Sequence, residues 1–577
     1  MRPSLKVKSC KVLPVLPSKC AVIIVGGGPC GLMLAIELGR RHIPTLLVDQ
    51  KASTAFNPQA NATQARTMEH FRRLGFADEV RALGMPSDYP TDVAYFTRFA
   101  KYELTRFQLP SARDAYNSVK SLSGSWSAAE LPHRVSQKFV EAVLRRHAEA
   151  CPSVSVNYGW RLASLRQSGQ GVEAVVERLE DGASQTVEAP FLVGADGPRS
   201  MTRAYIGSDY SGETGIVRNF MGGRMLAIYL RAPSFYNDTG HRPAWMHVTF
   251  NAERRAFMAA VDGRGEFAFH TQLRPDEDES SITDETARAM FSAATGIPIE
   301  IDILSRGTWT AGHTLVADRF RKGRVFIAGD AAHLFTPTGG LGYNTAIEDA
   351  VNLGWKLSAV LKGQAGAALL ETFESERRAI AERNTRYARL FADSLGRLSP
   401  PAEIEDDTAE GAAAREMAGA YFLEHARAEF NIPGITFGGR YDGSPGIVSD
   451  GTSPPPDMAN EYRPSACPGG RPPHAWLTGN ISLFDTFGPE WTLLRLGPHA
   501  PDGAGFVSAA TRLGLQLDVV GIKDGPIRDL YQCDLALIRP DQIVAWRGND
   551  ESEAFALLRA LNFSDTHRSE ELAENRA

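Results

Sequence analysis

The sequence has few cysteines and no pattern that would pair them. Its 577 residues contain six: Cys10, Cys20, Cys30, Cys151, Cys467 and Cys533. They form no CxxC motif and no histidine-linked cluster at metal-ligand spacing. This scatter argues against a zinc site and against a disulfide framework. We therefore expect no metal, and a reducing, cytoplasmic setting.

The chain also lacks an unbroken apolar run and an excess of basic charge. Lys and Arg number 62 against 68 Asp and Glu, so the net charge of −6 gives no basis for nucleic-acid binding. Residues 21–39 are long enough to imitate a membrane span, but five glycines and a proline interrupt them. Residues 1–18 are basic without the apolar core of a signal peptide, and we expect a disordered extension. No membrane association is predicted.

A glycine-rich turn follows the first apolar strand. Residues 21–25 have the β-branched composition of a buried parallel strand, and residues 32–38 have that of a helix. A second strand, residues 43–48, ends at Asp49. This order of strand, GxGxxG turn, helix, strand and acid is the dinucleotide fingerprint. The predicted cofactor residues are Asp49, for ribose hydroxyls, and the turn at the helix N-terminus, which includes Gly26, Gly28, Pro29 and Gly31.

A second ligand-binding pattern spans residues 324–357, RVFIAGDAAHLFTPTGGLGYNTAIEDAVNLGWKL. A short buried strand, residues 325–328, ends at Gly329 and Asp330, whose carboxylate can accept hydrogen bonds from sugar-like hydroxyls. Pro337 and three glycines then form a loop that a ligand can approach closely. Helical spacing of apolar residues begins at Tyr343, so free N–H groups at the helix start can face an anion.

Together these two patterns resemble the FAD-dependent aromatic hydroxylases, the single-component flavoprotein monooxygenases of phenol-hydroxylase type. The resemblance implies that Asp330, after Gly329, holds the ribityl chain. It also implies that Pro337 and the following loop lie against the isoalloxazine ring, and that the helix start faces the pyrimidine end of the reduced flavin. The loop and helix-start positions concerned are Gly339, Gly340, Gly342, Tyr343 and Asn344.

The resemblance adds further site residues. Arg66 would meet the flavin, Gln137 the flavin chain, and Asp196 the pyrophosphate near the route of the nicotinamide. Each also has an ordinary interpretation: a surface arginine, an exposed glutamine, and an Asp-Gly-Pro turn. Asn61 stands near the position where phenol hydroxylases commonly carry an acid, and an asparagine cannot act as a base.

The substrate pocket is expected beneath an antiparallel sheet. Candidate wall residues are Tyr229, Trp245, His247, Phe257 and His270, of which only some can face the pocket because alternate strand residues point opposite ways. By resemblance His270 occupies the position of a tyrosine that meets the phenol oxygen. The alternative is a sheet-face histidine without a role. With Asn61 and Pro337, His270 completes the predicted reaction site.

The predicted fold is α/β in three parts. A Rossmann-like FAD-binding monooxygenase domain covers residues 19–398, with a mixed or antiparallel substrate sheet inserted at about 206–304. Residues 399–470 form a proline-rich linker with a helical segment. Residues 471–577 resemble the thioredoxin-like C-terminal domain of phenol-hydroxylase-type enzymes and, lacking CxxC, should have no redox role.

The expected function is hydroxylation of a small aromatic, phenolic substrate with O₂ and NADPH or NADH. By resemblance it proceeds through a flavin hydroperoxide on non-covalently bound FAD, in a homodimer. Two alternatives remain open: a hydroxylase of a larger polyketide or antibiotic ring, and a flavin-binding protein without turnover. A flavin halogenase is disfavoured because no two tryptophans form the Trp-x-Trp motif.

Overall fold

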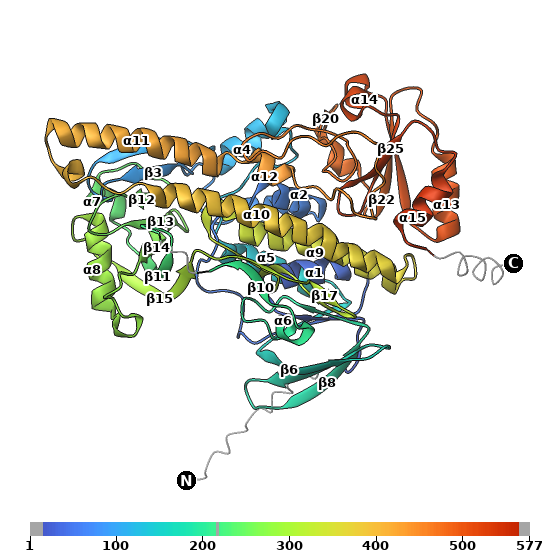
Figure 1. The fold of residues 1–577 in the computed structure, drawn as a ribbon, viewed down its shortest axis with the longest axis horizontal. Coiled ribbons are helices and arrows are strands. Elements are labelled where there is room, and N and C mark those ends of the chain that lie inside the picture. Colours follow the sequence, from blue (N-terminus) through green and yellow to red (C-terminus); the bar gives the residue numbers. More distant parts are fainter. Residues whose placement is uncertain (1–15, 215–217, 565–577) are drawn as a thin grey trace, which may run out of the picture.

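The computed structural model describes residues 16–214 and 218–564. Its central region lies between a large sheet, which contains β11 to β15, on one side and a C-terminal α/β unit on the other (Figure 1). The extension predicted for residues 1–18 falls, up to residue 15, outside the described residues. Leu16 is buried, and the Ser18 carbonyl accepts a hydrogen bond from the Glu188 N–H at 2.9 Å. The described end of that stretch is therefore docked on the fold.

A six-stranded sheet forms the centre of the molecule, in the order β17-β18-β9-β1-β2-β5. Only β17 runs antiparallel to its neighbour. Short apolar runs, buried on both faces, produce such parallel strands. Its strands are β1 (Val22–Val25), β2 (Thr45–Asp49), β5 (Val154–Tyr158), β9 (Phe191–Gly194), β17 (Arg321–Lys322) and β18 (Val325–Ile327).

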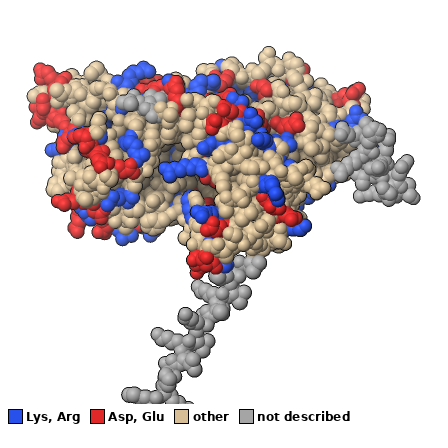
Figure 2. All heavy atoms as spheres, turned by 60° about the horizontal axis from the view of Figure 1, so that its bottom comes forward, with Lys and Arg blue, Asp and Glu red and all other residues tan. Residues whose placement is uncertain are grey.

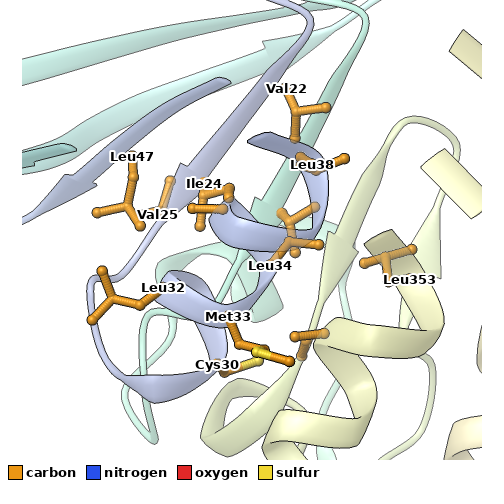
Figure 3. Close-up of a cluster of buried hydrophobic side chains, with 14 of the residues drawn as sticks. Val22, Ile24, Val25, Cys30, Leu32, Met33, Leu34, Leu38, Leu47 and Leu353 are labelled. Carbon is orange, nitrogen blue, oxygen red and sulfur yellow. The ribbon is translucent and has the colours of Figure 1, made fainter. Parts of the chain in front are cut away.

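Helix α1 (Pro29–Gly39) is buried between this sheet and helix α9 (Leu341–Leu361). Every residue from Cys30 to Gly39 is buried, as expected of a helix that is apolar apart from Glu37, which pairs with Arg41 and Arg73. Figure 3 shows α1 side chains such as Leu34 between the strands and Leu353 of α9. This packing fixes the N-terminus of α1 at the carboxyl edge of the sheet, where open α/β sheets bind ligands.

Shorter elements surround this core. One antiparallel sheet contains β6 (Trp160–Gln167), β7 (Val172–Arg178) and β8 (Ser184–Ala189). A second small sheet contains β10 (Tyr210–Glu213), β16 (Thr314–Ala317) and β19 (His333–Phe335). The neighbouring helices are α2 (Ala65–Arg73), α3 (Ala77–Arg81), α4 (Ala112–Ser118), α5 (Gln137–Glu149) and α6 (Met201–Ile206).

The substrate sheet has seven strands in the order β15-β11-β14-β13-β12-β3-β4. Its edge pair comes from residues 93–107, outside the predicted insertion, because β3 pairs in parallel with β12. Sequence patterns could not show this pairing, since it joins segments about 150 residues apart. Its strands are β3 (Val93–Phe96), β4 (Glu103–Phe107), β11 (Gly223–Arg231), β12 (Met246–Thr249), β13 (Ala256–Ala260), β14 (Glu266–Gln272) and β15 (Asp302–Ala311).

Helices cover both faces of the substrate sheet. One face packs on α7 (Phe235–Thr239) and α8 (Asp284–Thr295), where the rings of Phe291 and Phe269 lie 5.3 Å apart. On the other side α11 (Ala409–Phe430), followed by α12 (Pro433–Phe437), lies beside α10 (Thr372–Arg397) (Figure 1). Phe422 of α11 stacks on Tyr95 at 4.8 Å. Much of the predicted linker is thus a packed cover.

The C-terminal unit follows the order β-α-β-α-β-β-α. Its sheet is ordered β23-β22-β24-β25, with β22 and β23 parallel and β24 antiparallel to both neighbours. This is the strand order of a thioredoxin-like domain, as predicted. A small β20–β21 ladder precedes it. The elements are β20 (Trp476–Leu477), β21 (Ile481–Ser482), β22 (Trp491–Leu496), α13 (Ala504–Leu513), β23 (Leu517–Ile522), α14 (Gly525–Tyr531), β24 (Leu535–Ile538), β25 (Val544–Gly548) and α15 (Ala554–Leu561).

The surface matches the mixed composition. Acidic and basic side chains are interspersed over the face in Figure 2, and basic ones border a hollow near its middle. Within residues 16–214 and 218–564, no helix combines the length and apolarity needed to cross a bilayer.

Candidate active site

Two glycines of the first motif are required by close backbone contacts. Gly26 has φ +112°, and a Cβ on it would lie 2.0 Å from the carbonyl oxygen of Ala195 on the adjoining strand. A Cβ on Gly31 would lie 1.9 Å from the carbonyl oxygen of Gly26. These contacts seat α1 against the end of β1, so either side chain would push the helix away.

Gly28 is open where its neighbours are crowded. A Cβ built on it meets no protein atom within 4 Å, and its φ of −80° suits any residue. Pro29 follows as the first residue of α1, where its missing N–H costs no hydrogen bond. The space in front of the N-terminus of α1 suits an anion that must approach the backbone closely.

Asp49 is held beside this turn. One carboxylate oxygen accepts a hydrogen bond from the Gly27 N–H at 2.6 Å, and the other accepts from the Lys51 N–H at 2.6 Å. The Tyr158 hydroxyl donates to the Gly27 carbonyl at 2.8 Å. The acid at the end of β2 is therefore fixed next to the glycine turn, which is the arrangement that ribose binding needs.

The second motif presents its acid to open space. Gly329 has φ +60°, and its N–H donates to Asp349 at 3.0 Å. Asp330 is exposed, and desolvation by the surrounding protein raises the pKa of its carboxyl group, an effect that His333 and Lys51 oppose. The Tyr210 hydroxyl donates to its main-chain carbonyl. The carboxylate itself stays available to a ligand.

Asn344 ties the loop before α9 to the segment that precedes α2. Its Oδ1 accepts a hydrogen bond from the Gln64 N–H at 2.8 Å. Its Nδ2 donates to the carbonyls of Ala62 at 3.0 Å and Gly340 at 2.7 Å. The helix starts at Leu341, two residues earlier than predicted, after the left-handed Gly339 and Gly340.

Buried polar atoms without partners gather around this junction. Among the described residues, the side-chain oxygens of Asn61, Thr63, Ser136 and Tyr343 lack a hydrogen bond. Burial raises the pKa of Tyr343; the nearby Thr63 hydroxyl lowers it, although their geometry falls short of a hydrogen bond. Unpartnered buried polar groups call for a ligand or water. With the two glycine turns and the free carboxylate, this junction fits the polar edges of FAD.

Gln137 and Asp196 lie beside the predicted cofactor surface, but both side chains have protein partners. Gln137 begins α5 and donates to Glu141 at 2.7 Å. Residues 131–136, just before that helix, are extended because His133 pairs with Thr63. The Asp196 carboxylate accepts hydrogen bonds from the Thr202 N–H and hydroxyl, both at 3.0 Å, in the first turn of α6.

Arg66, predicted to meet the flavin, has protein partners for its guanidinium. Its guanidinium donates to the main-chain carbonyls of Asp541 and Gln542, at 3.1 and 3.0 Å, and pairs with Glu69 at 3.1 Å. These acceptors belong to the C-terminal domain and to its own helix. Arg66 thus joins α2 to the last domain, a contact that local sequence could not reveal, and its cofactor role stays a prediction that these contacts do not support.

The candidate wall residues divide between the two faces of the substrate sheet. Phe257 and His270 are paired neighbours and stack 4.5 Å apart, on the same face as Tyr229. His247 is on the opposite face, packed among Phe99 and other rings. Burial lowers the pKa of His247 to about 3.

His270 is neutral and oriented. The Trp309 indole N–H donates to its Nδ1 at 3.1 Å, so its proton is on Nε2. Burial lowers its pKa to about 4. His270 can therefore donate a hydrogen bond from Nε2, but at neutral pH it holds no positive charge.

Two residues of the site carry no sequence signal. Glu429, near the end of α11, accepts a hydrogen bond from the Gly339 N–H at 2.9 Å and so fixes the predicted flavin loop. Arg134 places its guanidinium 4.5 Å over the ring of Trp245. Both come from segments that the sequence places far from the substrate sheet, and only the tertiary fold brings them together.

Comparison with known proteins identifies the architecture. Residues 19–388 match a family model described as an FAD binding domain, and residues 465–563 match one described as aromatic-ring hydroxylase, C-terminal. Phenol 2-monooxygenase of Pseudomonas sp. (strain EST1001) is 30% identical, covering 91% of this chain and 89% of its own. Aklavinone 12-hydroxylase DnrF of Streptomyces peucetius is 32% identical, covering 84% and 91%. The solved structure of native and K252c-bound RebC-10x has a TM-score of 0.84 at 32% identity, covering 95% and 100%.

Proposed function

The chain belongs to the FAD-dependent aromatic-ring hydroxylases, and on that premise we propose that it adds one hydroxyl group to a phenolic ring, using NAD(P)H and O₂. The reaction balances as ArH + O₂ + NAD(P)H + H⁺ giving ArOH, H₂O and NAD(P)⁺. Bound FAD supplies the electron transfer from NAD(P)H and the activation of O₂. The protein must bind FAD and the aromatic substrate, orient the two rings relative to each other, and exclude water from the site.

Specific residues would hold the cofactor. The N-terminus of α1 and the open side of Gly28 suit its pyrophosphate, and Asp49 suits the adenosine ribose. Asp330 offers an exposed carboxylate to the ribityl hydroxyls. The unpartnered oxygens of Asn61 and Ser136 suit the polar edge of the flavin ring.

One observation carries the proposal: Ala62 joins the cofactor loop to the substrate sheet. Ala62 packs in the same hydrophobic cluster as Tyr95 and Met225 of that sheet. A Cβ on Gly340 would lie 3.1 Å from the Cβ of Ala62. The predicted flavin loop and the sheet that carries His270 therefore share one wall, so a ring held under the sheet lies beside the cofactor.

The wall orients the substrate rather than deprotonating it. Asn61 cannot act as a base, and His270, with a pKa of about 4, is a neutral donor through Nε2. A ring hydroxyl can accept that hydrogen bond at its oxygen. Substrates whose hydroxyl ionises readily should therefore react best, because an ionised phenol is the more electron-rich ring.

A larger fused-ring substrate is the second candidate. On the face that carries His270, the sheet has small residues at neighbouring positions, including Ala227, Ala259, Ala268 and Gly307. Small side chains on this face of the sheet leave more space beneath it for a ligand. This observation favours a polyketide-like aromatic over a single-ring phenol.

A substrate panel tests the proposal. FAD-loaded enzyme would be given single-ring phenols and fused-ring phenols, and both NAD(P)H loss and hydroxylated product would be measured. We expect slow NAD(P)H oxidation alone and a large acceleration with a matching phenol, with product equal to the NAD(P)H consumed. FAD binding without NAD(P)H oxidation under any of these conditions would instead indicate a flavin-binding protein without turnover.

A further inference from the structure

Arg134 is a buried arginine at the border between the cofactor loop and the substrate sheet. It follows His133, whose main chain exchanges hydrogen bonds of 2.8 and 2.9 Å with Thr63. Its guanidinium lies 4.5 Å over the ring of Trp245 and 5.9 Å over that of Phe430. Only 6% of the residue is exposed.

This guanidinium has no partner among residues 16–214 and 218–564. No carboxylate lies within 4.0 Å of it, and it donates no hydrogen bond. Burial lowers its pKa to about 10, an effect that the charge of Glu429 only partly opposes, so Arg134 remains protonated at neutral pH. One carboxylate oxygen of Glu429 accepts a hydrogen bond from the Gly339 N–H, and the other lies 2.9 Å from Nε2 of His425.

Arg255 shows what a structural arginine looks like in the same sheet. It is also buried without a carboxylate and also packs on two aromatic rings, Phe220 and Phe250. Its terminal nitrogens, however, donate to the main-chain carbonyls of Leu395 at 3.1 Å and Leu398 at 3.2 Å. The fold therefore supplies acceptors for two of its three nitrogens, whereas no acceptor for Arg134 is found among the described residues.

A buried charge without a partner lowers the stability of the fold. Such a charge is therefore expected mainly where a bound ligand supplies its partner. A planar guanidinium matches an anionic oxygen, above all a carboxylate, with two parallel donors. The aromatic faces of Trp245 and Phe430 support the guanidinium on one side. We propose that Arg134 is a specificity residue that binds an anionic oxygen of the aromatic substrate, either a ring carboxylate or an ionised ring hydroxyl.

The position of Arg134 gives this contact a purpose. Thr63, beside His133, is next to Gln64, whose side chain donates to the Gly339 carbonyl at 3.0 Å. An anion on Arg134 would therefore be held close to the predicted flavin loop, while the rest of the ring extends under the sheet. That part of the inference rests on the proposed function; anion binding by Arg134 does not.

Equilibrium dialysis of the full-length, FAD-loaded protein tests the inference with three small probes. They are benzoate, its neutral counterpart benzamide, and tetrafluorophenol, which is ionised at neutral pH. We expect benzoate or tetrafluorophenol to bind more tightly than benzamide, and Arg134→Met to weaken the preferred anion by about 10- to 100-fold without affecting benzamide. Arg134→Lys should keep part of the preference. The tighter of the two anions identifies the class of substrate oxygen.

Thermal unfolding separates a ligand role from a structural one. Arg134→Met should leave Tm unchanged or raise it, because it removes an unpartnered charge. The matched Arg255→Met should lower Tm, since two carbonyls lose their donors, while anion binding persists in the folded protein. If Arg134→Met lowers Tm and leaves benzoate and tetrafluorophenol binding unchanged, Arg134 is structural and the inference is wrong. If anion binding depends on Arg134 but no phenol accelerates NAD(P)H oxidation, only the proposed function fails.

Discussion

The cofactor cradle, meaning the two glycine turns with Asp49 and Asp330, and the substrate roof, meaning the seven-stranded sheet, are built by different means. The cradle consists mainly of main chain: glycines that allow close approach, free helix N-termini, and two carboxylates at strand ends. The roof consists of side chains that project from alternate positions of seven strands, completed by residues from α11 and from the segment before α5. The cradle follows from short sequence motifs, whereas the roof depends on strand pairing between distant segments.

The sharpest test of the cradle compares two glycines of one motif. Gly31→Ala should disrupt both fold and FAD binding, because its Cβ would lie 1.9 Å from a carbonyl oxygen. Gly28→Ala should keep the Tm of the apoprotein, because its Cβ meets no protein atom. It should lose most FAD affinity, because that Cβ would occupy the space proposed for the pyrophosphate. The FAD retained on gel filtration measures cofactor binding by each variant, and the Tm of each apoprotein measures its stability.

Equal behaviour of the two variants would contradict this division. Full FAD occupancy in Gly28→Ala would show that the open space before α1 is not the pyrophosphate site.

Asp330 gives the next largest effect. Asp330→Ala should weaken FAD binding about 10- to 100-fold, since hydrogen bonds to a charged group contribute about 1.5–3 kcal/mol. The apoprotein should be no less stable, because the side chain is exposed. Fluorescence titration of FAD into apoprotein measures the affinity. Asp330→Asn keeps a hydrogen-bond acceptor, so its FAD affinity should lie between those of the wild type and Asp330→Ala. Unchanged FAD affinity in both variants would show that Asp330 is not part of the cofactor site.

The two faces of the roof differ in their pH dependence. The pKa of His247 falls to about 3 in the folded protein from an ordinary value of 6.5, so the unfolded chain takes up a proton first as pH falls. The free energy of unfolding is therefore unaffected by His247 above pH 6.5. Between pH 6.5 and about 3 it falls by at most about 1.4 kcal/mol per pH unit, because only the unfolded chain binds the proton.

His247→Leu should therefore flatten the loss of stability between pH 6.5 and about 3, measured by urea unfolding at a series of pH values. His270→Phe should flatten it over a narrower window, because the pKa of His270 is lowered only to about 4. Unlike His247→Leu, it should also alter phenol binding. A profile unchanged by His247→Leu would contradict burial of the neutral imidazole.

The smallest effect is expected in the C-terminal domain. Cys533 is buried, and its pKa is raised to about 12, so the thiol is protonated and unreactive at neutral pH. Cys533→Ser should leave the NAD(P)H-driven rate nearly unchanged in steady-state assays. Loss of turnover in a folded variant would give this domain a redox role.

The same division explains how much the sequence could predict. The strand–turn–helix units around Gly26 and Asp330 have local signals, and both are found as predicted. The pairing of β3 with β12 and the contact of Arg66 with Gln542 join segments without local signals. Periodicity correctly warned that the candidate wall residues would divide between faces, but it could not say that Phe257 and His270 share one and His247 the other.

Labelled oxygen tests the central claim most directly. The FAD-loaded enzyme would turn over its best phenolic substrate with NAD(P)H under isotopically labelled O₂, and the product would be analysed by mass spectrometry. The account predicts one labelled oxygen atom at a ring carbon, with one NAD(P)H consumed for each product. Label that enters from water instead of O₂ would contradict it.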